Sequence, residues 1–313
     1  MNGLELSRRF YEEYGAPMLH GEFPRWEGQI AVGLLGSGSE CLGYDDEVSR
    51  DHDFEPGFCI FLPGEDVIDR RTAFLLERAY AKLPREYEGY RRENVNPVGG
   101  ARRGVLRWSE FLTEKVGSPD GELTLSQWFT VPEQALLEVT AGAVFRDDGG
   151  LLTEARERLA FFPEDVRRKK LAGHLLLMAQ SGQYNYARCL RHGETGAAQL
   201  AAVEFVKSAM SAAFLLSRRY QPYYKWAFRA LRDLPQLHTM AEPLEYLLTT
   251  PCEGETAEEK QDMIEAVAAT VIDVLQEQDL TKAICGDLEK HAYSVNDSVT
   301  DPEIRNSHVL AAV

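Results

Sequence analysis

The chain has 313 residues, of which 44% are apolar and 27% are charged. This composition is that of an ordinary soluble globular protein, and the length suggests two domains. We expect no membrane contact, because no apolar run approaches the roughly 18–20 residues of a spanning helix. The N-terminal segment has no apolar stretch of signal-peptide type, and the five cysteines are scattered without a CxxC pair. The sequence therefore predicts a cytoplasmic protein without a disulfide framework or structural zinc.

The formal net charge is −16, and it is distributed unevenly. Residues 1–150 carry −11 and residues 151–313 carry −5. A strongly acidic protein does not hold nucleic acid by its phosphates, so we expect no nucleic acid among its partners. The acidity can attract metal ions or a cationic small substrate, or it can simply keep the protein soluble.

The first half of the chain alternates helical and strand patterns. Apolar spacing near three to four residues predicts helices, and short apolar runs bounded by Gly or Pro predict strands. The expected elements are a helix over 4–15, strands over 29–35 and 53–62, a helix over 69–83 and a strand over 104–108, with 144–146 as a short fourth strand or an extended link.

From residue 151 the pattern is helical throughout, with prolines between the segments. The expected helices cover 151–161, 164–181, 197–219, 222–232, 241–250, 256–278 and 281–294. We therefore predict an α+β protein, with a small mixed sheet and flanking helices in a domain over 1–150. An all-α helical bundle domain over 151–313 follows, joined to the first near 148–151.

The stretch from 36 to 53 carries the residues that point to chemistry. It begins with the Gly-Ser turn (Gly36-Ser37-Gly38-Ser39), and Asp51-His52-Asp53 follows where the second strand is expected to start. Side chains two residues apart on a strand share a face, so the strand prediction puts both carboxylates on one face. Paired carboxylates can hold two divalent cations about 3.5–4 Å apart, as phosphoryl and nucleotidyl transfer require.

The Gly-Ser turn suits a phosphate because it lacks bulky side chains. Its backbone N–H groups and its serine hydroxyls can approach phosphate oxygens. Two other phosphate motifs do not fit, because position 41 is Cys where GxGxxG needs Gly, and no GK[ST] follows the glycines. The alternative is an acidic loop that only turns the chain.

This arrangement resembles the signature of the DNA polymerase β-like nucleotidyltransferase superfamily, a Gly-Ser pair followed by Asp-x-Asp or Asp-x-Glu on a strand. More narrowly, SRDHDF at 49–54 and YQPYYKWAFRALRDLP at 220–235 resemble a bacterial family of nucleotidyltransferase-like proteins whose domain has no known function. The helical half is similar to the tail of aminoglycoside nucleotidyltransferases of the kanamycin-resistance type.

The resemblance implies a Mg²⁺-dependent enzyme that transfers a nucleoside monophosphate, in the simplest case AMP from ATP, to a small molecule or a protein. Asp51 and Asp53 would hold two Mg²⁺ ions, and the Gly-Ser turn would bind the phosphates of ATP or another NTP. The nucleotide, the acceptor and the oligomeric state cannot be predicted from the sequence.

The chain departs from the superfamily pattern in two places. A later strand usually supplies a third carboxylate, but Val105-Leu106-Arg107 contains none, and Glu110 follows the strand. Glu110 could complete the site, or it could be a favourable charge at the start of a helix. The stretch 178–184 also lacks the glutamate base of the kanamycin-type enzymes, which argues against an aminoglycoside acceptor. The alternative function is a catalytically weak nucleotide-binding regulatory or antitoxin-like module.

Further residues near the motif and in the helical half also need interpretation. Arg50 could contact a phosphate or balance neighbouring acids, and strand alternation would point His52 away from the metals. Tyr224 could stack on a base and Lys225 could meet the triphosphate, or both could be packing residues at a helix start. The basic run 167–170 (RRKK) predicts a solvated helix face, with contact to RNA or to an acidic partner as the alternative.

Overall fold

The computed structural model divides into two compact units. The described residues are 1–48, 54–92 and 103–313. The sheet unit consists of Met1–Gln127 and Gln134–Ala160, and the helical unit consists of Trp128–Glu133 and Phe161–Val313. The sequence pattern placed one boundary at 150, whereas the contacts place it after Ala160 and assign 128–133 to the helical unit.

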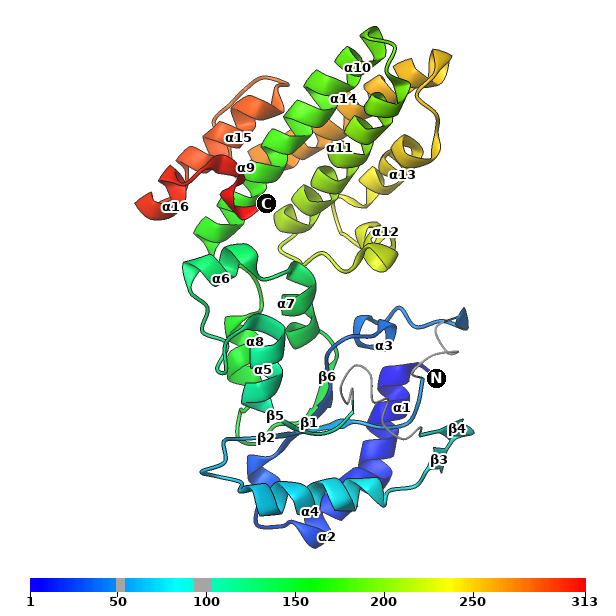
Figure 1. Ribbon diagram of the computed structural model, residues 1–313, viewed down its shortest axis with the longest axis vertical. Coiled ribbons are helices and arrows are strands. Elements are labelled where there is room, and N and C mark those ends of the chain that lie inside the picture. Colours follow the sequence, from blue (N-terminus) through cyan, green and yellow to red (C-terminus); the bar gives the residue numbers. More distant parts are fainter. Residues whose placement is uncertain (49–53, 93–102) are drawn as a thin grey trace. The chain divides into compact units, whose positions relative to one another are not determined.

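The described part of the sheet unit combines short strands with helices, which agrees with the expected α+β class. Its helices are α1 (Gly3–Phe10), the π-helical η1 (Tyr11–Gly15), α2 (Ala16–Glu22), the 3₁₀ turn η2 (Glu27–Gln29), α3 (Ser39–Leu42), α4 (Arg70–Ala81), α5 (Trp108–Val116) and α8 (Thr153–Arg158), with most of α7 (Glu133–Thr140). Its strands are β1 (Ala31–Leu34), β2 (Cys59–Leu62), β5 (Gly104–Arg107), β6 (Ala143–Arg146) and the short pair β3 (Glu86–Tyr87) and β4 (Tyr90–Arg91). Figure 1 shows these elements in chain order.

The main sheet of the described residues has the strand order β5-β2-β1-β6. Strand β1 is antiparallel to β2 and to β6, whereas β2 and β5 are parallel. Parallel neighbours need a long crossover connection, and helix α4 lies in the connection from β2 to β5. The sheet is therefore mixed, as the sequence predicted.

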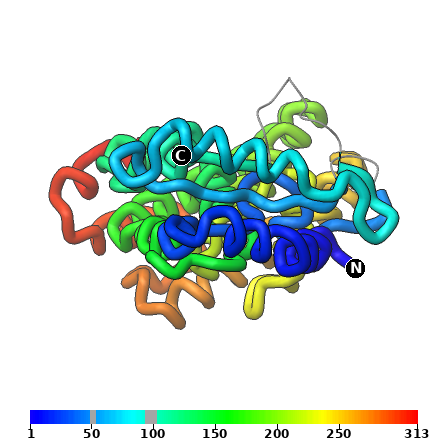
Figure 2. Tube along the Cα trace, turned by 90° about the horizontal axis from the view of Figure 1, so that it is seen from below, coloured from blue at the N-terminus to red at the C-terminus, as the bar shows by residue number. Residues whose placement is uncertain are grey.

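The two faces of the sheet bury different side chains because strand residues alternate between faces. Val32, Ile60 and Leu62 belong to a core shared with α1, α2 and α4. Figure 2 looks at the sheet unit from the side of these helices. Phe61 lies on the opposite face of the sheet and packs against two rings of α5. Its ring centroid is 5.3 Å from that of Trp108 and 5.5 Å from that of Phe111.

Strand β2 is shorter than the sequence predicted. We expected a strand over 53–62, but residues 54–58 are not in a strand, and β2 begins at Cys59. Proline has no N–H to donate and glycine weakens a strand, so Pro56-Gly57 explains the late start. We expected the acids before residue 54 to share one face because they would lie on a strand. Residues 54–58 are not in a strand, so the described part of this segment does not support that reason.

No strand follows Arg146 in the described range 103–313, as predicted. The α- and π-helices of the helical unit are α9 (Glu164–Met178), η4 (Ala179–Tyr186), α10 (Ala187–Arg191), α11 (Thr195–Leu216), α12 (Tyr224–Arg232), α13 (Ala241–Thr249), α14 (Gly254–Glu277), α15 (Leu288–Asp297) and α16 (Pro302–Asn306), and α6 (Leu125–Thr130) ends in this unit. Two 3₁₀ turns, η5 (His238–Met240) and η6 (Val309–Ala312), also belong to it. Helix α9 packs against α11, α15 and η6.

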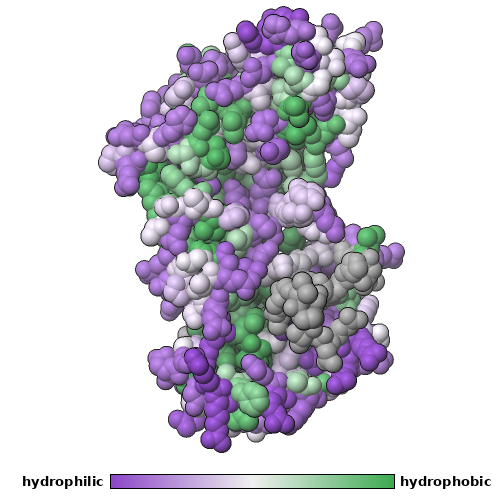
Figure 3. Space-filling model, viewed as in Figure 1, coloured by the Kyte–Doolittle hydropathy of each residue, from purple (hydrophilic) through white to green (hydrophobic). Residues whose placement is uncertain are grey.

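Helix α11 is more apolar than we expected from the sequence. Among the described helices, it alone is long and apolar enough to cross a membrane. Of its most apolar window, 61% is buried inside the protein, as in the core helix of a soluble protein. Hydrophilic side chains are common on the visible face of each unit (Figure 3), in keeping with the 27% of charged residues.

Candidate functional site

The predicted metal ligands lie outside the described residues. Asp51 and Asp53 fall in the segment 49–53, as do Arg50 and His52. Their assignment as metal ligands stays a prediction, and described residues precede and follow them in the chain. Within 1–48, 54–92 and 103–313, no group of three or more His, Cys, Asp or Glu side chains could hold a metal ion.

The Gly-Ser turn follows β1 directly, and its backbone explains its glycines. Gly36 has φ +104° and Gly38 has φ +130°, conformations that side chains with a Cβ rarely adopt. The Gly36 N–H donates to the Glu138 carbonyl oxygen at 3.0 Å, which fixes the start of the turn. Ser37 is exposed, and Ser39 begins the short helix α3.

Strand pairing brings the Gly-Ser turn to the same sheet edge as the chain that leads into β2. Gly33 near the end of β1 pairs with Cys59, the first residue of β2. Cys59 in turn pairs with Gly104, the first residue of β5. The end of β1 and the starts of β2 and β5 therefore meet at one edge. In sequence, Asp53 precedes this edge of β2 by six residues.

Three charged residues that the sequence analysis did not select meet at this edge. Arg103, just before β5, lies 3.4 Å from a carboxylate oxygen of Glu40 and 3.5 Å from one of Glu55. The Arg103 side chain is 7% exposed and that of Glu40 is 10% exposed, so both ions are largely removed from water. Buried charges need partners, which accounts for the pairing. Glu55 continues the two-residue spacing of the acids before it, a signal that could have identified it.

Glu110 lies at the other end of β5. It occupies the first turn of α5 and is exposed, so the structure shows the helix-start position that was the alternative. The end of β5 from which α5 begins pairs with Leu62, the last residue of β2. Glu65 raises the pKa of Arg70, and Glu110 adds to that shift. Glu110 therefore lies near Arg70 at the start of α4. The structure gives no support to its assignment as the third acid of the predicted metal site.

Lys225 and Tyr224 lie in the first turn of α12, which begins two residues later than predicted. Both side chains are exposed. The Lys225 Nζ lies over the Trp226 ring, 5.0 Å from its centroid, and the Tyr223 and Tyr224 rings are 4.1 Å apart. Nucleotide binding by Lys225 and Tyr224 stays a prediction.

The prediction that 167–170 form a solvated helix face is wrong. Lys169 and Lys170 are 0% and 6% exposed, and Arg167 is 2% exposed. The C-terminal segment explains this burial, because its backbone carbonyl groups accept hydrogen bonds from both lysines. The Lys169 Nζ donates to the carbonyl oxygens of Arg305 and Ser307, and the Lys170 Nζ to that of Ala312. The ammonium groups of Lys169 and Lys170 are therefore not available to RNA or to another partner.

A second set of titratable groups lies around Lys170. The Glu133 carboxylate accepts the Gln221 N–H at 3.0 Å, and burial raises the pKa of Glu133. Burial also raises the pKa of Tyr220. Burial, together with the positive charge of Lys170, lowers the pKa of His174 to about 3. His174 is therefore uncharged at neutral pH.

Comparison with known proteins gives one match. A family model described as a domain of unknown function (DUF4037) matches residues 128–227. The matched region includes Tyr224 and Lys225 and does not include the Gly-Ser turn or the predicted metal ligands. No curated protein and no solved structure matches the chain.

Proposed function

We propose that the protein is a Mg²⁺-dependent nucleotidyltransferase that moves a nucleoside monophosphate to a small-molecule or protein acceptor. One observation carries the proposal: the pairing of Gly33 with Cys59 joins the Gly-Ser turn and the chain leading into β2 at one edge of the sheet. A phosphate-binding turn and a metal-binding segment must be neighbours for this chemistry. In sequence, the Asp51-His52-Asp53 segment directly precedes that chain.

The donor set of Asp51 and Asp53 fits magnesium, which binds one or two carboxylates together with substrate phosphates. Bound there, Mg²⁺ would neutralise phosphate charge and stabilise the departing pyrophosphate. In the reaction, an acceptor oxygen or nitrogen forms a bond to the α-phosphorus of the nucleotide. The bond from that phosphorus to the bridging oxygen breaks, pyrophosphate leaves, and the acceptor loses a proton to solvent or to a base.

The described residues supply binding and positioning in this proposal. The open backbone at Gly36 and Gly38 lets phosphate oxygens approach the N–H groups of the turn, and the exposed Ser37 adds a hydroxyl donor. Arg103, next to the start of β5, pairs with Glu40 of α3 and with Glu55, which precedes β2. This ion-pair cluster gives the edge a fixed geometry, which a catalytic site needs.

The second candidate function is a nucleotide-binding regulatory or antitoxin-like module without turnover. It is favoured by the absence of any carboxylate on β5 (Gly104–Arg107), where the superfamily usually places its third acid. Residues 178–184 also carry no carboxylate that could act as a base.

One experiment separates the two candidates. Purified protein is incubated with α-labelled ATP, Mg²⁺ and fractionated cell extract, and label transfer is followed for wild type, Asp51→Ala, Asp53→Ala and Glu22→Ala. Glu22 is an exposed carboxylate of the same unit and serves as the matched control. We expect wild type and Glu22→Ala to transfer label, and both aspartate variants to remain folded but inactive.

A nonhydrolysable ATP analogue is titrated into the same proteins. Mg²⁺-dependent binding by wild type without label transfer would favour the regulatory module. Wild-type transfer rates in both aspartate variants would contradict the metal assignment altogether.

A further inference from the structure

A pocket of about 580 Å³ lies in the helical unit, between the start of α9 and the end of α11. Its lining includes four arginines and one carboxylate, from Arg167, Arg168, Arg218, Arg219 and Glu164. We call it the arginine pocket. With one acid against four permanent cations, these side chains carry a net charge of +3, in a chain whose total charge is −16. Such a local excess of positive charge is unusual enough to need an explanation.

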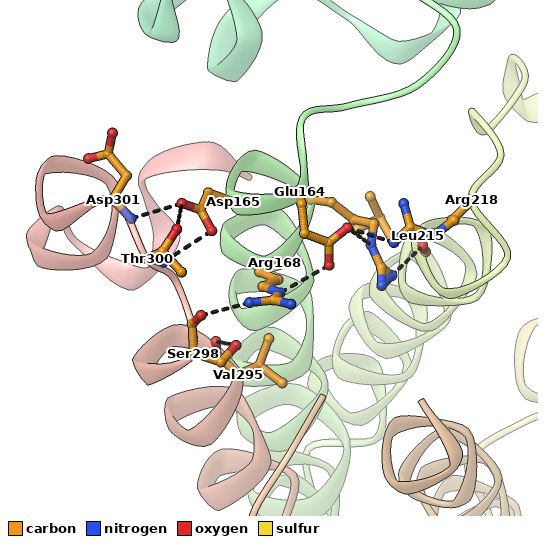
Figure 4. Close-up of polar contacts among 10 residues, drawn as sticks. Glu164, Asp165, Arg168, Leu215, Arg218, Val295, Ser298, Thr300 and Asp301 are labelled. Atoms are coloured by element: carbon orange, nitrogen blue, oxygen red, sulfur yellow. Dashed lines mark hydrogen bonds and ion pairs between the residues drawn. The ribbon is translucent and has the colours of Figure 1, made fainter. Parts of the chain in front are cut away.

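Glu164 is the common partner of three of the arginines (Figure 4). The Arg168 Nε lies 3.0 Å from one carboxylate oxygen of Glu164, and Arg218 and Arg167 lie 2.7 and 3.3 Å from the other. Burial acts to raise the pKa of Glu164, but the guanidinium groups outweigh it and lower this pKa. Glu164 therefore stays ionised and cancels only one of the positive charges.

Two of the arginines are held rigidly by the protein itself. Arg167 is 2% exposed, and its NH1 donates to the Leu215 carbonyl oxygen at 3.3 Å. Arg168 NH1 donates to the Ser298 carbonyl oxygen at 2.7 Å. Their guanidinium groups are thus fixed before any ligand arrives, which lowers the entropy that binding must remove.

Arg218 occupies a position where glycine is the usual residue. Helix α11 ends with the Arg218 N–H bonded to the Leu215 carbonyl oxygen and the Arg219 N–H bonded to that of Phe214. This is the Schellman pattern, in which the residue at Arg218 takes a left-handed conformation that costs least for glycine. Arg218 has φ +52°. From this strained backbone position the Arg218 side chain reaches Glu164 at the pocket.

Arg219 adds a positive charge to the pocket that no acid of the described residues neutralises. It lines the pocket and is exposed, and among the described residues no acid pairs with its guanidinium group. Loss of the Arg219 charge should therefore leave the fold intact.

We propose that the arginine pocket binds a small molecule through a phosphate or pyrophosphate group. A net charge of +3 suits a ligand group with two or more negative charges, whereas a single carboxylate is already supplied by Glu164. The planar, forked guanidinium groups match phosphate oxygens bidentately. The volume lies within the usual range of small-molecule pockets. This proposal goes beyond the proposed nucleotidyl transfer and does not depend on it.

The test is a calorimetric titration of the full chain with inorganic pyrophosphate in EDTA, so that no Mg²⁺-dependent site contributes. The variants are Arg218→Gly, which places the preferred residue at the helix end, and Arg219→Gln. Lys207→Gln is the matched control, since it removes one positive charge from an exposed position on α11. We expect one saturable site in wild type and in Lys207→Gln, and affinity lower by roughly tenfold or more in each arginine variant.

Further arms separate this site from the nucleotidyl-transfer site and identify the ligand class. Asp53→Ala should bind pyrophosphate as wild type does, whatever becomes of label transfer. Loss of binding in Asp53→Ala would place pyrophosphate elsewhere and overturn the proposal. Unchanged affinity in both arginine variants, or no saturable binding in wild type, would also overturn it. Citrate binding as tightly as pyrophosphate, or a short single-stranded RNA binding more tightly, would overturn the assignment to a small phosphorylated ligand.

Discussion

Gly38 adopts a backbone conformation that explains why glycine stands there. Its φ of +130° is strongly disfavoured for any residue with a Cβ. In Gly38→Ala, the turn must shift or the chain must carry about 1–3 kcal/mol of strain. We expect that loss in the free energy of unfolding, together with clearly weaker Mg²⁺-dependent binding of an ATP analogue. Thermal melting and titration of the analogue measure the two effects.

Gly196→Ala is the control for this substitution. A Cβ at Gly196 would meet no atom within 4 Å, and the residue lies in the first turn of α11. Alanine is the better helix former, so we expect this variant to be as stable as wild type or more stable by up to about 1 kcal/mol. If Gly38→Ala binds the analogue as tightly as Gly196→Ala does, the Gly-Ser turn is not a phosphate site.

The sequence identified residues whose role depends on local pattern and missed those whose role depends on distant contacts. A glycine-rich turn after an apolar run is a local signal, and the structure has the turn there. The burial of Lys169 could not be predicted, because its partner Ser307 lies 138 residues away in sequence. The pairing of Arg103 with Glu40 is likewise a contact across 63 residues. Charge alone predicts exposure, and only the fold shows the exceptions.

At the scale of elements, prediction succeeded where local chemistry decides the boundary. Asp69 accepts the Thr72 N–H and caps α4, which begins one residue after the predicted start. The predicted helix over 281–294 fails in its first part, because α15 begins only at Leu288, where Asp287 caps it. Here the capping residue Asp287 marks the true helix start, whereas apolar spacing alone does not.

Lys169 attaches α16 and the residue after it to α9, whereas Lys170 bonds to Ala312 of η6. The Lys169 Nζ donates to the Asn296 side chain at 2.8 Å and to two backbone carbonyl oxygens beyond α15. In Lys169→Met these buried acceptors lose their donor, which should lower the free energy of unfolding by about 2–3 kcal/mol. We also expect faster amide hydrogen exchange in α16 than in the wild type, because this helix loses its bonds to Lys169, whereas Lys170 still holds η6.

Lys207→Met is the matched control for the attachment, since Lys207 lies on α11 with a side chain that is 70% exposed. Its effect on stability should stay within about 0.5 kcal/mol. Exchange in α16 that is equally slow in Lys169→Met and Lys207→Met would show that other contacts hold this helix.

At the scale of the whole molecule, the chain passes between its two units more than once. Residues Trp128–Glu133 belong to the helical unit although sheet-unit segments precede and follow them. The Trp128 ring packs 5.9 Å from that of Phe162, and Gln221 donates to Glu133. A single boundary at 150 follows from the change in periodicity along the chain. Periodicity cannot show that a short segment leaves its neighbours in sequence, because that depends on tertiary contacts.

The stability of the whole molecule should fall in mild acid partly because of His174. Its ring is half-buried, and the Nδ1 atom is shielded from solvent without a hydrogen-bond partner among the described residues. Burial first, and then the charge of Lys170, lower the pKa of His174 to about 3 in the folded state. In the unfolded chain a histidine ionises near pH 6.5, so between pH 6.5 and pH 3 the unfolded state binds the extra proton.

The free energy of unfolding therefore decreases as the pH falls through this window. Because the ring keeps some contact with solvent, we expect a contribution of about 1–2 kcal/mol between pH 7 and pH 5. His174→Leu removes the titrating group, so its urea denaturation should lose that much less stability than wild type over the same interval. His192→Gln, at an exposed position, should follow the wild-type curve. Parallel pH dependence in wild type and His174→Leu would mean that His174 takes up its proton in the folded state, and that the charge of Lys170 is compensated near it.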